Sequence, residues 1–547
     1  MKILDTYKYE RDNVPVEVKI VSRDDEYVNT YEISKAKFQE ATSKVMEHIK
    51  EKIIEEVNVR PTEAHDAETM SKLREAFMAK ANEIVKRELV DMSEQTRKIV
   101  VGTLAHELIG LGEMELILAD ENLEEIVVNT SREPLWVYHK KHGWLKTNFF
   151  IQKEEQIMNY ASIMGRRVGR QITNLNPLLD AHLEGGDRAN ATLFPISTKG
   201  NSITIRKFAK SPWTITRMLT PEANVMSIDV AAMLWLCIHY EMNILIAGGT
   251  ASGKTSILNA LLVFTPPNQR VISIEDTREL YLPDFLHWLP MVTRLPNPEG
   301  KGEVSMLDLM VNSLRMRPDR IVLGEIRRQR EAEVLFEAMH TGHSVLATLH
   351  ADSAEQAKSR MTTPPINLPE SMLEAVHMIL VQYRQRRTGV RRTLELAEIV
   401  PYKSLVSVNK VYHWNSHDDT MEKVGDYMRV INDIMMFSGM TEKEVKQDLE
   451  ERRKILEYMV ANKIFDVNEV GRVSALFYRN KELLVEAIAK KMKPADLLKL
   501  QPGGKVEASA IVKLEASLGK KVEALTGGKA EAPAGKKVEP PAGKKSK

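Results

Sequence analysis

The chain has 547 residues, which is too long for one hydrophobic core, so about three domains are expected. A hydrophobic content of 43% and a charged content of 28% are typical of a folded globular protein and exclude a largely disordered one. The 77 basic and 76 acidic residues argue against direct nucleic-acid binding, and the single cysteine, Cys237, excludes a disulfide framework and a cysteine-based zinc site.

Apolar stretches are too short to predict a membrane span. The longest, such as residues 230–238, have about half of the roughly 20 residues that a transmembrane helix needs. The first residues also lack the hydrophobic core of a secretory signal. We therefore expect a cytoplasmic protein that reaches the inner face of the membrane only through partners.

Residues 1–108 predict a helical bundle with an irregular start. The first 34 residues mix β-type residues with charges and predict no regular element. From residue 34 onward, apolar residues recur at helical spacing. The clearest stripe consists of Val45, Ile49, Ile53 and Val57.

Residues 109–210 predict a small mixed α/β domain. Its short β-rich segments lie at 123–129, 134–140 and 200–208, with a helix predicted near 153–169. The next stretch, 211–224, has two prolines and no periodicity, so we interpret it as a hinge linker.

Residues 225–500 predict a wound α/β domain with a mainly parallel sheet and C-terminal helices. The apolar segments ILIAG, VISIED, RIVLGEI and SVLATLH alternate with helix-length segments up to about residue 400. From residue 501 onward, Lys and Glu recur every eight residues among small residues, Pro and Gly. This tail, 501–547, is predicted to be disordered.

The segment GGTASGKT, from Gly248 to Thr255, fits the phosphate-binding pattern G-x-x-x-x-G-K-[ST]. In this pattern backbone N–H groups surround the β-phosphate, Lys254 reaches the β- and γ-phosphates, and Thr255 can bind Mg²⁺. A predicted strand precedes the loop, and the N-terminal dipole of a predicted helix faces the phosphates. The predicted nucleotide-binding residues are Gly248, Gly249, Thr250, Ala251, Ser252, Gly253, Lys254, Thr255 and Ser256.

Acidic residues follow two other predicted strands. One strand ends in Gly324 and Glu325, and a carboxylate there would point into the ligand crevice and bind the metal together with Thr255. Another ends in Glu275 and Asp276, either of which could polarise the attacking water; Glu275 is the predicted general base. The alternatives are a solvated loop carboxylate for Glu325 and a turn cap for the adjacent pair.

Three histidines, His340, His343 and His350, fall within eleven residues. Their spacing is poor for a structural zinc site without cysteines, so we expect histidines that sense or neutralise γ-phosphate charge. His350 is the one we assign to catalysis. A histidine satisfied in the core is the alternative for one of the three.

These blocks, in this order, resemble the secretion ATPases that power type IV pili, type II secretion and the archaeal archaellum. The family's Walker A loop, Asp box, Walker B variant ending in Gly-Glu and His box correspond to Gly248–Thr255, Glu275–Arg278, Ile321–Arg327 and His340–His350. The resemblance covers about residues 100–490. It implies an α/β protein with a RecA-like P-loop NTPase domain and its parallel sheet, preceded by the small mixed α/β domain and the N-terminal helical bundle.

Residues 176–208 are similar to the family's arginine-bearing segment. The resemblance therefore assigns Arg188 and Arg206 to the half of the protein that closes over nucleotide, where an arginine can stabilise transition-state charge. Arg217 is a further candidate. The alternative is that each arginine only pairs with a neighbouring acid.

Within the superfamily, the archaellum motor ATPases are the most similar group. The four-cysteine zinc motif of many bacterial members is absent, and residues 176–208 and 391–402 resemble the corresponding sequences of archaellum motor ATPases. The resemblance implies ATP and Mg²⁺ as cofactors and a homo-hexameric ring that acts on a polytopic membrane platform protein and accessory motor-complex proteins. Adhesive pilus assembly, type II-like secretion, a bacterial-type retraction or conjugation ATPase, and a nucleic-acid translocase are the alternatives.

Overall fold

The computed structural model describes residues 1–35, 40–56, 67–89, 92–183, 186–208, 212–296, 300–403 and 405–500. The chain divides into two compact units, Met1–Ser474 and Ala475–Lys547. The predicted disordered tail and Val57 of the predicted helical stripe lie outside the described residues.

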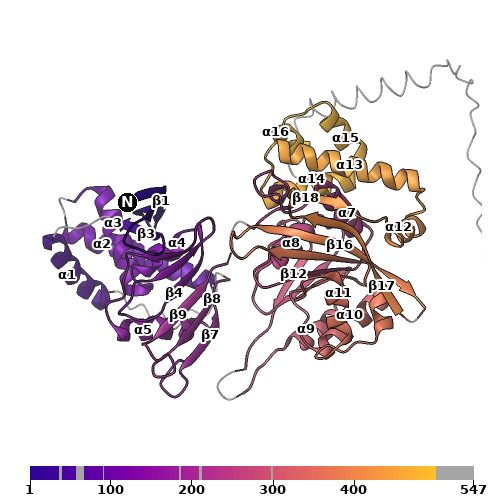
Figure 1. The fold of residues 1–547 in the computed structure, drawn as a ribbon. Helices are drawn as coiled ribbons and strands as arrows, with labels where there is room; N and C mark the ends of the chain where they lie inside the picture. Colours follow the sequence, from indigo (N-terminus) through magenta and orange to yellow (C-terminus); the bar gives the residue numbers. More distant parts are fainter. Residues whose placement is uncertain are drawn as a thin grey trace, which may run out of the picture. The chain divides into compact units, whose positions relative to one another are not determined.

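A first nine-stranded sheet occupies the N-terminal part of the larger unit (Figure 1). Its strands are β1 (Lys2–Arg11), β2 (Val14–Ser22), β3 (Thr30–Lys35), β4 (Leu123–Val128), β5 (Trp136–His139), β6 (Gly143–Thr147), β7 (Leu178–His182), β8 (Arg188–Thr192) and β9 (Ser202–Arg206). Their order is β1-β2-β3-β6-β5-β4-β9-β8-β7. Neighbours are antiparallel except β3 and β6, which are parallel.

The irregular start predicted for residues 1–34 is wrong, because these residues form three strands of this sheet. Along β2 the side chains of Val14, Val16, Val18 and Ile20 are buried and alternate with more exposed residues, which is the period of a half-buried strand. They pack in one core with α4 (Met114–Ala119) and α5 (Glu154–Arg167). The charged residues that obscured the pattern lie on the outward positions.

Three helices follow the first three strands and share a separate core. They are α1 (Glu40–Glu56), α2 (Ala67–Glu88) and α3 (Glu94–Ile109). Ile49 and Ile53 are fully buried as predicted, but Val45 is exposed and Met46 takes the buried position in its place. The helical pattern predicted for this stretch is thus present, and only the first position of its apolar face differs.

The bundle is fastened to the sheet at the β1–β2 turn. Asp12 in that turn accepts hydrogen bonds from Arg74 of α2 and faces His106 of α3 at 2.8 Å. Gly102 of α3 allows this approach, because a Cβ at that position would lie 2.0 Å from the Asp12 carbonyl oxygen.

A second nine-stranded sheet forms the core of the predicted wound domain (Figure 1). Its strands are β10 (Ile244–Gly248), β11 (Val271–Glu275), β12 (Trp288–Val292), β13 (Arg320–Leu323), β14 (Ser344–Leu349), β15 (Met378–Arg384), β16 (Arg391–Tyr402), β17 (Leu405–Asn415) and β18 (Thr420–Lys423). Their order is β12-β11-β13-β14-β10-β15-β16-β17-β18. The strands from β12 to β15 are parallel, and β16, β17 and β18 add an antiparallel extension that the sequence analysis did not predict.

Helices cover both faces of this sheet. The helices α9 (Met306–Ser313), α10 (Gln329–His340) and α11 (Ala354–Thr362) share one core with alternate residues of the parallel strands. The helices α7 (Ile228–His239) and α8 (Lys254–Leu262) lie outside that core, and α8 contacts β10 and β14, so it covers the opposite face. This arrangement confirms the predicted wound α/β fold with a mainly parallel sheet.

Of the remaining elements, one 3₁₀ helix precedes β15 and the others follow β18. They are the 3₁₀ helix η2 (Glu370–Ala375), α12 (Val430–Ser438), α13 (Glu442–Ala461) and α14 (Val467–Arg479), and then α15 (Lys481–Ala489), α16 (Pro494–Leu497) and the 3₁₀ helix η3 (Leu498–Leu500). No helix among the described residues is long and apolar enough to cross a membrane.

The hinge linker predicted for residues 211–224 needs a correction. The short helix α6 (Ile215–Met218) lies within it, and Ile215 and Met218 are buried. The buried hydroxyls of Thr214 and Thr216 donate to the carbonyl oxygens of Phe465 and Ile464, at 3.0 and 2.7 Å. This part of the segment is therefore anchored to the turn between α13 and α14 and is not a free connection.

Candidate nucleotide-binding and catalytic site

The predicted site residues meet at one edge of the second sheet. The strands β11, β13, β14 and β10 are parallel neighbours, so their carboxyl ends lie side by side. Glu275 ends β11, Glu325 follows β13, His350 follows β14, and the loop that begins at Gly248 follows β10. The sheet therefore brings together the acidic residues, a histidine and the phosphate loop in the crevice where parallel sheets bind ligands.

The phosphate loop depends on two glycines. Gly248 and Gly253 have φ angles of +153° and +99°, which side-chain-bearing residues rarely adopt. A Cβ on Gly248 would also lie 2.5 Å from the Gln382 carbonyl oxygen. Between them, Ala251 has a φ of +57°, and the buried Ser252 hydroxyl has no hydrogen-bond partner within the described part of the chain. The loop is thus a close-packed turn, and the Ser252 hydroxyl is a polar group that a bound phosphate can use.

Lys254 begins helix α8 and is largely buried at the loop. Its Nζ donates to the carbonyl oxygens of Gly248 and Gly249, at 2.9 and 3.0 Å, and lies 3.3 Å from Nδ1 of His350. Burial lowers the pKa of Lys254. The amine is therefore held at the loop by weak neutral acceptors, which an anionic phosphate can displace.

The other predicted loop residues lie around this lysine. Thr255 is half-buried in the first turn of α8, while Thr250 and Ser256 are exposed. The Gly249 backbone has Asp352 as its neighbour, since a Cβ at Gly249 would lie 3.1 Å from the Asp352 carboxylate. The N–H groups at the start of α8 are without partners inside the helix and are available for a ligand.

His350 connects Lys254 to Glu325. Its Nε2 lies 2.8 Å from Oε1 of Glu325, while its Nδ1 faces the lysine ammonium. Burial, together with the charge of Lys254, lowers the pKa of His350. The neutral tautomer with the proton on Nε2 satisfies both contacts, because Nδ1 then accepts and Nε2–H donates.

Glu325 is also paired with Arg327. The Nε of Arg327 donates to Oε2 of Glu325 at 2.7 Å, and its guanidinium also pairs with Asp276 at the end of β11. Both oxygens of Glu325 thus have partners. Asp276 is bound by an arginine and is a less suitable base than its neighbour Glu275.

Glu275 is almost completely buried, with 2% of its surface exposed. Its Oε1 accepts hydrogen bonds from the backbone N–H groups of Glu279 and Leu280, at 2.9 and 3.1 Å. Within the described part of the chain, its Oε2 has no partner. Burial raises the pKa of Glu275 to about 7, so the carboxylate can exchange a proton near neutral pH.

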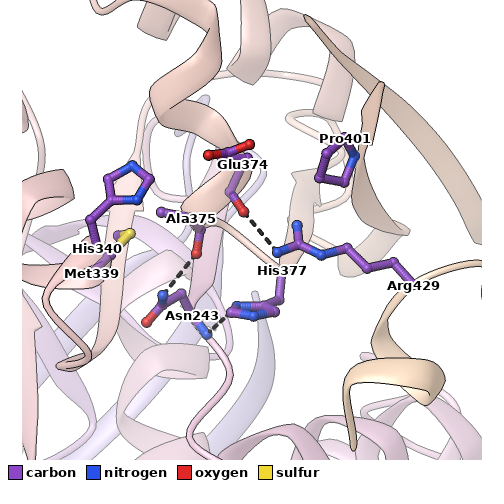
Figure 2. Close-up of a pocket in the computed structure, with 8 residues that line it drawn as sticks. All are labelled: Asn243, Met339, His340, Glu374, Ala375, His377, Pro401 and Arg429. Atoms are coloured by element: carbon purple, nitrogen blue, oxygen red, sulfur yellow. Dashed lines mark hydrogen bonds between the residues drawn. The ribbon is translucent and has the colours of Figure 1, made fainter. Parts of the chain in front are cut away.

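The other two histidines of the predicted group lie elsewhere. His343 contacts Thr341 and the carbonyl oxygen of Ala338. His340 lines a pocket of about 290 Å³ together with Asn243 and His377, which precede β10 and β15 (Figure 2). That pocket lies at the amino ends of the strands, so the expectation that all three histidines flank the phosphates is wrong for these two.

The predicted arginines are paired in the structure. Arg188 forms a two-point ion pair with Asp180 across β7 and β8, with contacts of 3.0 and 2.6 Å. Arg206 lies 3.2 Å from a carboxylate oxygen of Glu279. Arg217 stacks near the rings of Trp213 and Phe465, at 5.9 and 5.8 Å. Each arginine that the resemblance assigned to transition-state stabilisation therefore has another partner here.

Three residues at this site were not assigned from the sequence. Arg327 is the last residue of the Walker B block and Asp352 follows the His block by two residues, so these positions were the available signal. The third, Arg391, donates from Nε to the Ala251 carbonyl oxygen at 3.1 Å. It lies 140 residues after Ala251, in the segment 391–402 that carries part of the family resemblance, but nothing in that segment indicates a contact with the loop.

A glycine loop at the carboxyl edge of a parallel sheet, a lysine at the start of the next helix, and acids on the neighbouring strands define a P-loop nucleotide-binding protein. Residues 187–465 match the family described as "Type II/IV secretion system protein". The chain belongs to the type II/IV secretion system family and is an ATPase.

Several relatives are similar to the chain. An uncharacterized protein of Methanocaldococcus jannaschii is 36% identical over 398 residues, which are 71% of each chain. The type IV secretion system protein PtlH of Bordetella pertussis is 31% identical and is covered to 89%, over 50% of this chain. Among solved structures, the Yersinia pseudotuberculosis ATPase DotB matches 66% of this chain and 92% of its own, with 15% identity and a TM-score of 0.40.

Proposed function

We propose that the chain is a Mg²⁺-dependent ATPase that works as a homo-hexameric ring and drives archaellum assembly and rotation. The observation that carries the hydrolytic part is Oε2 of Glu275, which has no hydrogen-bond partner among the described residues. It lies at the same edge of the sheet as the hydrogen-bonded chain of Lys254, His350 and Glu325. The archaellum assignment is supported by the resemblance of residues 176–208 and 391–402 to the archaellum motor ATPases.

The phosphate loop binds the triphosphate of ATP. The ammonium of Lys254 exchanges the carbonyl oxygens of Gly248 and Gly249 for β- and γ-phosphate oxygens, and the N–H groups at the start of α8 complete the contacts. The hydroxyl of Ser252, which has no hydrogen-bond partner among the described residues, adds a donor within the same loop.

Thr255 and Glu325 would hold Mg²⁺, and the donor set fits this cation because hydroxyl and carboxylate oxygens are its preferred ligands. When bound, the metal neutralises charge on the β- and γ-phosphates. Glu325 is held by Arg327 and His350, so its carboxylate is positioned before any ligand arrives.

Glu275 accepts the proton of the attacking water. The water oxygen bonds to the γ-phosphorus, the bond from the γ-phosphorus to the bridging oxygen of ADP breaks, and the proton goes to Oε2 of Glu275. His350 contacts both Lys254 and Glu325, so it responds to the charge change at the γ-phosphate when hydrolysis occurs.

Arg188 and Arg206 would complete the site when the N-terminal half closes over the nucleotide. For this, Arg188 must leave Asp180 and Arg206 must leave Glu279, and both must then bind phosphate oxygens. Within the predicted hinge linker 211–224, Thr214 and Thr216 are anchored, so the closure would not bend the chain at these two residues. In a ring, such closures would move a polytopic platform protein and accessory motor-complex proteins at the inner face of the membrane.

The test of this function is Lys254→Ala. The variant should release phosphate from ATP at background rate, because the β- and γ-phosphates lose their cation. The matched control is Lys443→Ala on the exposed surface of α13, which should keep the wild-type rate. Phosphate release by the variant at a wild-type rate would overturn the site assignment.

In the source organism, the same substitution should abolish swimming and leave surface attachment intact. Loss of attachment or of protein export with normal swimming would instead assign the ATPase to an adhesive pilus or to secretion, the function named for PtlH. Stimulation of the wild-type enzyme by DNA would favour a nucleic-acid translocase.

A further inference from the structure

A second cationic side chain approaches the phosphate loop from the far side of β10. Arg391 is the first residue of β16, and its Nε donates to the carbonyl oxygen of Ala251 at 3.1 Å. Its aliphatic stem passes over Gly253, since a Cβ at Gly253 would lie 3.5 Å from Cδ of Arg391. The side chain thus lies along the outer wall of the loop, immediately before the start of α8.

The charge of Arg391 is not neutralised by any carboxylate among the described residues. Its neighbour Arg392 shows the contrast, because it forms an ion pair with Asp419 at 2.6 Å and also bonds to a backbone carbonyl. Only Nε of Arg391 has a partner in the described chain, so the two terminal nitrogens and the face of the guanidinium are available. A half-exposed arginine fixed at one nitrogen is pre-oriented for a ligand.

The order of the strands indicates which part of a bound nucleotide would lie close to Arg391. The catalytic groups Glu275, Glu325 and His350 all follow strands on one side of β10, and Arg391 belongs to β16, two strands away on the other side. Because β16 is antiparallel to β15, its amino end lies at the same edge of the sheet as the phosphate loop. If the γ-phosphate lies toward the acids, the nucleoside would leave the loop on the opposite side, over β15 and β16.

We propose that Arg391 binds the nucleoside end of ATP by placing its planar guanidinium against the base. Lys254 and the loop N–H groups already serve the phosphates, whereas no residue assigned so far contacts the base. An arginine plane stacks on an aromatic ring, and this contact accepts any nucleobase because every base has a π-face. The inference rests on the proposed nucleotide site and adds to it a residue that recognises the nucleoside.

The test compares binding of MgATP, MgADP and magnesium tripolyphosphate to purified full-length protein by calorimetry. Arg391→Ala should weaken MgATP and MgADP about five- to twentyfold, as expected for one stacked base, and leave tripolyphosphate within about twofold. Arg391→Lys should remain at least about threefold weaker for MgATP, since an ammonium is not planar. Arg387→Ala, in the exposed turn between β15 and β16, is the matched control and should bind as wild type.

Three results would overturn the inference. An equal loss for tripolyphosphate would mean that Arg391 only supports the left-handed Ala251, and full rescue by lysine would mean a charge contact with phosphate. Unchanged MgATP binding by Arg391→Ala would remove the contact altogether. Each of these leaves the ATPase function intact, whereas wild-type protein that binds no MgATP would remove the proposed function and this inference with it.

Discussion

At the residue scale, Glu275 illustrates how burial makes a carboxylate suitable as a general base. Two backbone N–H groups donate to one of its oxygens, and the other oxygen is buried without a hydrogen-bond partner in the described chain. Burial disfavours the charged form and raises the pKa to about 7, which is close to the optimum for a general base at neutral pH.

This pKa predicts the pH dependence of hydrolysis. The base must be deprotonated, so kcat should rise with pH through about 7 and fall on the acidic side as Glu275 gains its proton. Glu275→Gln should lower kcat about 10²- to 10⁴-fold, measured by phosphate release at saturating MgATP. Asp276→Asn is the adjacent control; if it instead causes the larger loss, the base has been assigned to the wrong acid.

At the element scale, the segment from Thr214 to Leu219 shows how a linker can be part of a domain. The sequence offers two prolines and no periodicity, yet the structure buries this segment and bonds both threonine hydroxyls to carbonyls about 250 residues away. Such a long-range contact leaves no local pattern, so it could not be predicted.

Thr216→Val tests this anchor. Valine keeps the shape of the side chain but leaves the Ile464 carbonyl oxygen without its donor, which should lower the free energy of unfolding by about 1–3 kcal/mol. Urea unfolding followed by circular dichroism measures this change. Thr220→Val is the control, because Thr220 is half-exposed and bonds only within its own turn; equal losses in both variants would argue against a special anchor.

Strand β14 shows a second lesson at this scale. Its six residues, Ser344–Leu349, span about 20 Å from one edge of the sheet to the other. His343 precedes the strand and His350 follows it, so residues close in sequence lie at opposite edges. Their proximity in the sequence suggested that the histidines form one group. Strand β14 instead separates His343 from His350.

At the scale of the whole molecule, the predictable parts were those with a local signature. The phosphate loop, Glu275, Glu325 and the parallel strands were readable because apolar runs ending in glycine or acid repeat along the chain. The strands of residues 2–35 were missed although β1, β2 and β3 are sequential antiparallel neighbours, because charged residues at the outward positions obscured their alternation. The orphan state of Glu275 Oε2 and the contact of Arg391 depend on tertiary packing alone.

The proposed ring makes a prediction about mixtures of subunits. Native mass spectrometry with MgADP should detect six copies of the 62.1 kDa chain. If the subunits of a ring act together, an equal mixture of wild type and Lys254→Ala should hydrolyse ATP at well below half of the wild-type rate. A linear fall with the fraction of variant would indicate independent subunits and contradict the ring motor.

The fastening of the β1–β2 turn to α2 and α3 has a mechanical consequence. The carboxylate of Asp12 contacts both Arg74 and His106, and Gly102 allows the close approach, so α2 and α3 are joined to the β1–β2 turn. A protein that binds these helices would thereby also be connected to the first nine-stranded sheet. A force applied to the helical bundle would therefore be transmitted to the sheet, whose strands β8 and β9 bear Arg188 and Arg206.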